Sequence, residues 1–139
     1  MSAGTNIFGG REYRKYVSLK IANNLKDLGW DIYTKYQYVN GDHFTSKTLE
    51  ECIAWEQDKK PIVYVPDILQ AHVFLNSKFP EYQVYLEKPD GNGWRGVVVK
   101  GNQLLWHGLI YGENKYWEVY GGAILECTEI LKREFCQDT

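Results

Sequence analysis

The sequence has no long apolar run and no dominant charge. No stretch approaches the ~18 apolar residues that would span a bilayer, and residues 1–10, MSAGTNIFGG, contain no basic region followed by an apolar one. We therefore expect no membrane segment and a protein that stays in the cytoplasm, where it is made. The 16 basic and 18 acidic residues give a formal charge of -2 without a long run of either sign, which argues against duplex nucleic acid and membranes as partners.

Cysteine pairs and catalytic motifs are missing as well. Cys52, Cys127 and Cys136 are odd in number, lie far apart and form no CxxC, so we expect reduced thiols and no zinc site. The glycine-rich PDGNGWRG segment contains no GxxxxGK[ST] loop and has no strand–GxGxxG–helix context, and no serine lies in a GxSxG elbow. The sequence therefore predicts no cofactor, no metal and no enzyme.

The three histidines are isolated in the sequence. His43 follows Asp42, but neighbouring residues of a strand point to opposite faces. His72 has no acidic or histidine partner at HExxH spacing, which favours a half-buried polar residue on a helix flank. A small enzyme whose site is assembled only by the fold, using for example His107 and Glu87, remains a third hypothesis.

Aromatic side chains are what the sequence has in excess. They make up 15% of the residues, with 11 Tyr and 5 Trp, which is more ring surface than a core of this size easily holds. Exposed ring clusters are typical of binding or oligomer surfaces. We therefore expect part of the aromatic set to lie on a surface with a binding role.

Apolar periodicity predicts four helices. They are expected at about 12–28, after a Ser46 or Thr48 cap, from Pro66 to about 79, and at about 116–134. The last of these contains Gly121 and Gly122, which cost a helix roughly 1 kcal/mol each relative to Ala. We therefore expect both glycines to mark a close approach of this helix to a sheet.

Strand signals complete an α+β fold. Residues 30–39 alternate and run into Asn40-Gly41, which predicts a hairpin with a return strand at 42–45. PIVYV is a further short strand, and three runs separated by turns, at 82–88, 94–100 and 103–112, predict an antiparallel meander. After a flexible N-terminus at 1–10, we expect one domain over 11–139: a three-stranded meander packed on helices, with an N-terminal helix plus β-hairpin unit.

Alternation along the meander predicts an aromatic face turned away from the helices. If Tyr82, Val84 and Leu86 face the helices, Tyr85 faces outward; Trp94, Val98 and Lys100 then join it while Val97 and Val99 pack inward. The residues expected to bind a ligand or partner are Tyr85, Trp94, Arg95, Lys100, Trp106 and His107. Rings beside basic side chains suit a partner protein or a small nucleotide-like ligand. An alternative is that the N-terminal hairpin covers these rings.

Three segments resemble a family of small uncharacterised α+β proteins common in tailed phages and in gut Bacteroidetes genomes. The segments are VSLKIANNLKDLGWD, VPDILQAHVFLNSKF and YWEVYGGAILECTEILK, within residues 17 to about 132. The chain departs from the family pattern at VPD, at Phe74-Leu75 and at Gly121-Gly122. The family has no established activity, so the resemblance implies no catalytic residue. It implies a mobile-element origin and a protein of the host-cell cytosol.

Together these observations predict a non-enzymatic, phage-like binding protein. It would act on a host macromolecule or sequester a small nucleotide-like ligand, for instance as a counter-defence factor. The alternative is a self-associating structural or accessory protein whose open aromatic sheet face is a homodimer interface.

Overall fold

The computed structural model describes residues 16–136, so the flexible N-terminus expected at 1–10 lies outside the described part of the chain. The fold is α+β, with two antiparallel sheets packed against helices. The α-helices of residues 16–136 are α2 (Leu19–Asp27), α3 (Leu49–Gln57), α4 (Ile68–Lys78) and α5 (Tyr116–Phe135). Each expected helix is therefore present.

Local capping chemistry sets where the helices begin. Thr48 and Asp67 each form a capping box, in which the cap side chain accepts the backbone N–H of the residue three positions on, and the cap backbone N–H donates to the side chain of that residue. At Asp67 the two distances are 2.7 and 2.9 Å. Ser18 Oγ accepts the Ile21 N–H at 3.3 Å, so α2 begins at Leu19. The expected start near residue 12 lies outside the described residues, and Tyr16 is not helical as predicted, because it forms a β-bridge with Asp67 instead.

A small sheet follows α2, with strand order β2-β1-β3. Its strands are β1 (Tyr36–Val39), β2 (His43–Thr45) and β3 (Ile62–Val65). Asn40 and Gly41 have positive φ values of 53° and 97°, as the hairpin turn requires. The expected strand at 30–39 is shorter than predicted: the Thr34 hydroxyl bonds the Tyr36 carbonyl and the Val65 N–H, taking the place of ladder bonds.

The larger sheet is the expected antiparallel meander. Its strands are β4 (Tyr82–Glu87), β5 (Gly93–Lys100), β6 (Gln103–His107) and β7 (Tyr111–Gly112). β6 and β7 pair with the same strand, β5, and residues 108–110 interrupt them, so the single run expected at 103–112 is divided. The 3-10 turn η1 (Glu113–Lys115) then leads into α5.

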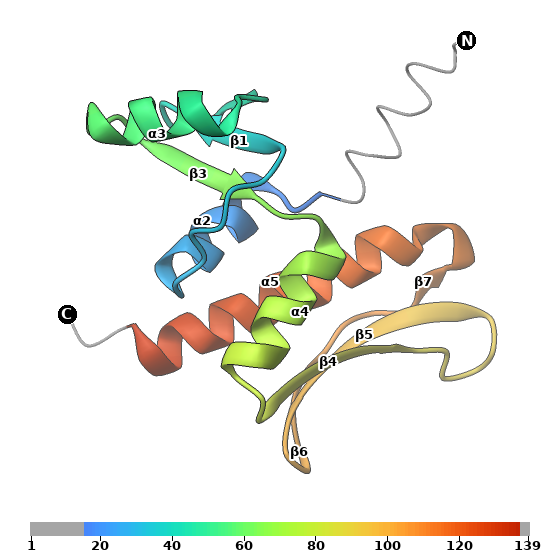
Figure 1. Cartoon of the computed structure of the whole chain (residues 1–139). Coiled ribbons are helices and arrows are strands. Elements are labelled where there is room, and N and C mark those ends of the chain that lie inside the picture. Colours follow the sequence, from blue (N-terminus) through green and yellow to red (C-terminus); the bar gives the residue numbers. More distant parts are fainter. Residues whose placement is uncertain (1–15, 137–139) are drawn as a thin grey trace, which may run out of the picture.

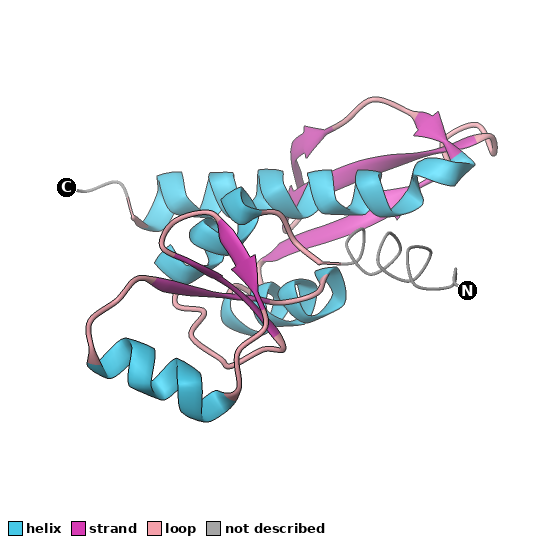
Figure 2. Cartoon of the chain, turned by 90° about the horizontal axis from the view of Figure 1, so that it is seen from above, coloured by secondary structure: helices cyan, strands magenta, loops and turns pink. Residues whose placement is uncertain are grey.

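The elements stack in four layers (Figure 1). The meander lies against α4 and α5. On the other side of α5, α2 packs between this helix and the small sheet, and α3 covers that sheet. α4 and α5 cover one face of the meander, as expected. Figure 2 shows the small sheet and the meander as separate units on either side of α5. The idea that the N-terminal hairpin covers the meander's rings is therefore wrong.

Aromatic side chains lie in the core and on the surface. Tyr33, Tyr85, Tyr111 and Phe135 are exposed. The three cysteines are free thiols, and Cys52 and Cys127 are buried. Burial raises the pKa of the Cys127 thiol to about 12. None of the described helices is long and apolar enough to cross a membrane.

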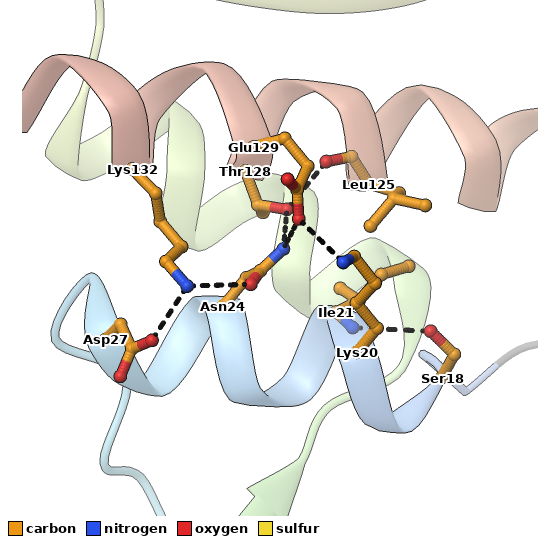
Figure 3. A network of polar contacts seen from close by, with 9 residues as sticks. All are labelled: Ser18, Lys20, Ile21, Asn24, Asp27, Leu125, Thr128, Glu129 and Lys132. Carbon is orange, nitrogen blue, oxygen red and sulfur yellow. Dashed lines mark hydrogen bonds and ion pairs between the residues drawn. The ribbon is translucent and has the colours of Figure 1, made fainter. Parts of the chain in front are cut away.

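A buried polar network fastens α2 to α5 (Figure 3). The Asn24 side chain, 4% exposed, donates to Thr128 Oγ1 at 3.1 Å and to Glu129 Oε2 at 2.7 Å. Lys132 donates to Asn24 Oδ1 at 3.2 Å and pairs with Asp27 at 2.9 Å. The hydrogen bond from Asn24 holds the pKa of Glu129 below its usual range, and nearby lysines reinforce this.

Replacing Asn24 tests the network. Asn24→Ala removes the hydrogen bonds that Thr128 and Glu129 accept from the Asn24 amide, so we expect the free energy of unfolding to fall by about 1–3 kcal/mol. Urea unfolding at pH 7 measures the change. Lys20→Ala is the control, because it removes only the exposed contact with Glu129 and should cost about 0–1 kcal/mol. Equal losses in the two variants would contradict a central role for Asn24.

Candidate ligand-binding groove

Strand register divides the six predicted binding residues between the two faces of the meander. Directly paired residues of antiparallel strands share a face. Val98 pairs with Val84 and with Trp106, and it is fully buried against the helices. Tyr85 and His107 both pair with Val97, so they lie on the opposite, outer face. The prediction that Val98 faces outward and Val97 inward is wrong, because a one-residue difference in register exchanges the faces.

The remaining three predicted residues interact within the protein. The Trp94 ring packs edge-on against Tyr116 at 5.0 Å between centroids. Arg95 forms an ion pair with Glu87, its Nε lying 2.8 Å from the carboxylate. Lys100 lies on the helix face, because it pairs with Tyr82 and its ammonium lies over that ring. Trp94 and Lys100 thus share the helix side with Trp106, and a binding role for these residues stays a prediction.

A groove of about 670 Å³ lies between α5 and the β6–β7 edge of the meander, and we call it the α5 groove. The strand side of the α5 groove contributes Trp106, His107, Gly108, Leu109 and Tyr111. The helix side contributes Glu118, Val119, Gly122, Leu125 and Glu126. The structure therefore brings two predicted residues, Trp106 and His107, together with helix residues that the sequence did not single out.

Two glycines make room for the indole of Trp106. A Cβ atom at Gly108 would lie 2.9 Å from that ring, and one at Gly96 would lie 3.4 Å from it and 2.8 Å from Ala123 Cβ. The four other tryptophans each pack on a ring or under a lysine: Trp30, Trp55, Trp94 and Trp117. Trp106 makes no such ring or cation contact with the described residues, so its indole is left to form one wall of the groove.

Gly122 leaves the helix side of the groove open. A Cβ atom there would have no neighbour within 4 Å, and one at Gly121 would meet only Ile68 of α4, at an ordinary 3.7 Å. The expectation that both glycines mark a close approach to the sheet is wrong, because the close approach is between Gly96 and Ala123. Gly122 disfavours the helix in which it lies, and no neighbouring atom requires its small size. This glycine is therefore the residue whose presence in the sequence points to the groove.

The charged groups of the groove are few. Lys115 Nζ lies 3.6 Å from Glu118 Oε2, so these two residues form an ion pair. His107 is exposed, and its Nδ1 contacts the Gly108 carbonyl at 3.2 Å. Glu126 has no hydrogen-bond or ion-pair partner within residues 16–136. No cluster of His, Cys, Asp or Glu in the described chain is arranged to hold a metal ion.

The fold does not unite His107 and Glu87, the pair considered for an enzyme. They lie on β6 and β4, with β5 between them, so about 10 Å of sheet separates their strands. A different histidine has an aromatic partner: His72 Nδ1 hydrogen-bonds the Tyr120 hydroxyl. This pair borders a small hollow of about 230 Å³, which Tyr85 and Trp94 also line. His72 Nε2 is buried without a hydrogen-bond partner among the described residues.

Acid should destabilise the protein through His72. Burial lowers the pKa of this imidazole, so the unfolded chain binds the proton more readily. Neutral His72 contributes fully to stability above its pKa in the unfolded chain, about 6.5. This contribution is lost as the pH falls from there toward the lower pKa that His72 has in the folded protein. We expect His72→Gln to flatten the fall in unfolding free energy below pH about 6.5 in urea titrations. His43→Gln, at an exposed position, is the control; equal slopes in both variants would exclude His72 as the cause.

Comparisons with family models, with curated proteins and with solved structures found no match to this chain.

Proposed function

We propose that this protein is a non-enzymatic binding protein that holds a small ligand with a ring system in the α5 groove. Gly122 carries this proposal. Glycine costs the interior of α5 about 1 kcal/mol relative to alanine, and the surrounding protein has room for a side chain there. A bound ligand that fills the open space beside Gly122 would explain why a glycine stands at this position.

The dimensions and lining of the groove support a ligand of this kind. Its volume of about 670 Å³ lies within the range of small-molecule sites, which are mostly apolar with a few polar groups. Trp106 offers a ring surface on one wall, and Val119 and Leu125 offer apolar contacts on the other. Within the groove lining Glu118 is paired with Lys115, and His107 contacts a backbone carbonyl and not a carboxylate, which favours binding over catalysis.

Filling the groove tests the proposal. Gly122→Leu places a side chain on the open floor, so we expect it to weaken binding of the neutral fluorescent probe N-phenyl-1-naphthylamine by about tenfold or more. Gly121→Ala is the matched control, because it makes the same kind of helix-favouring change at a residue outside the groove lining. Both variants should melt no lower than the unmodified protein.

The proposal fails if the unmodified protein does not bind the probe, or if Gly122→Leu binds it as well as Gly121→Ala does. Melting temperatures recorded on the same samples separate a blocked groove from an unfolded chain.

A second candidate function is association through the outer face of the meander. Tyr85 and Leu104 are 45% and 55% exposed on this face, on either side of β5. Such exposed apolar side chains suit a second copy of the chain, and the phage resemblance suggests a host protein as the other partner.

Sedimentation equilibrium tests self-association. We expect a dimer that the double variant Tyr85→Lys, Leu104→Lys converts to a monomer, because two buried charges on each partner would oppose contact. Lys substitutions at Leu49 and Ile53, which are exposed on α3, are the control. A monomer at all concentrations of the unmodified protein would remove this candidate.

A further inference from the structure

We propose that the ligand of the α5 groove is an aromatic amine whose positive charge is received by Glu126. This inference rests on the proposed function, since it names the chemical class of the ligand in the same site. It is carried by the charges along α5, the open position between them and the indole of Trp106 on the opposite wall.

Helix α5 presents a stripe of three residues to the groove. Glu118, Gly122 and Glu126 are four positions apart, so they lie one above the other on the same side of the helix. The open floor at Gly122 therefore has a carboxylate about one helical turn away on each side. An occupant resting on Gly122 lies within reach of both.

The two carboxylates differ in what neutralises them. Glu118 is paired with Lys115, whereas Glu126 has no counter-charge among the described residues and is half-buried on the helix wall. The Lys and Glu side chains of the groove lining, Lys115, Glu118 and Glu126, together carry one net negative charge. A cationic ligand would neutralise Glu126, whereas a phosphate would face it unfavourably. The charge of the groove thus favours an amine over a nucleotide.

The indole of Trp106 strengthens the preference for a cation. Trp55 lies under Lys47 and Lys60, at 4.2 and 4.5 Å from ammonium to ring centroid, and Trp94 lies under Lys88 at 4.8 Å. Trp106 is left without such a partner in the described part of the chain. A ligand ammonium placed between this ring and Glu126 would make both a cation–π contact and an ion pair.

Three indoles that differ mainly in charge test the inference. Tryptamine is a cation at pH 7, tryptophol is neutral and indole-3-propionate is an anion. We expect ligand-observed NMR on the full chain to rank their affinities in that order, with tryptamine about threefold or more tighter than tryptophol. Because the preference is partly electrostatic, it should shrink when the salt concentration is raised.

Glu126→Gln removes the charge and keeps the shape. We expect this variant to lose the preference for tryptamine while its affinity for tryptophol stays unchanged. Glu50→Gln is the matched control, because it makes the same charge change on α3, on the far side of the small sheet (Figure 1). It should keep the ranking of the unmodified protein.

The outcomes separate the inference from the proposed function. If tryptophol binds and Gly122→Leu abolishes its binding, but tryptamine is no tighter, the groove is a ligand site and the inference about charge is overturned. Tightest binding of indole-3-propionate overturns it as well. If none of the three indoles binds, and N-phenyl-1-naphthylamine also fails to bind, both the inference about charge and the proposed function are overturned. The ranking in the unmodified protein decides the matter even if Glu126→Gln does not fold.

Discussion

The close contact between strand β5 and helix α5 sets the spacing on which the rest of the structure depends. Gly96 has no side chain, so Ala123 of α5 comes close to the sheet and the helix lies along the whole length of β5. The opposite side of α5 binds α2 through Asn24, and α2 in turn supports the small sheet. The groove opens where residues 108–110 interrupt the edge of the sheet beside this helix.

Local signals predicted most of the elements, because their causes lie within a few residues. The Asn40-Gly41 turn is present as expected, and the cap of α3 is Thr48, one of the two residues predicted for it. Failures occurred where a distant residue decides the outcome. The Thr34 hydroxyl bonds the backbone at Val65, which shortens the first strand, and the pairing of Val84 with Val98 reverses the expected faces of β5.

The groove itself was predictable only in part. The sequence indicates Trp106 as a ring on the third strand of the meander and His107 as a basic side chain near it, but the helix side of the groove comes from residues that are distant in sequence. Gly96 and Gly108 make space for an indole that neither alone would accommodate. Helix propensity marks Gly122 as costly and predicts a close approach to the sheet, whereas the structure has open space there. Helix propensity signals that a glycine needs a reason, and only tertiary structure supplies that reason.

The three free thiols give the layers of this protein a built-in set of chemical probes for motion. Cys52 is buried between α3 and the small sheet, Cys127 is buried on α5, and Cys136 is partly exposed at the end of that helix. A buried thiol reacts with a soluble reagent only when its surroundings open. The rates at which these cysteines are modified therefore report how often the outer layer, the central helix and its last turn separate from their neighbours, without any engineered label.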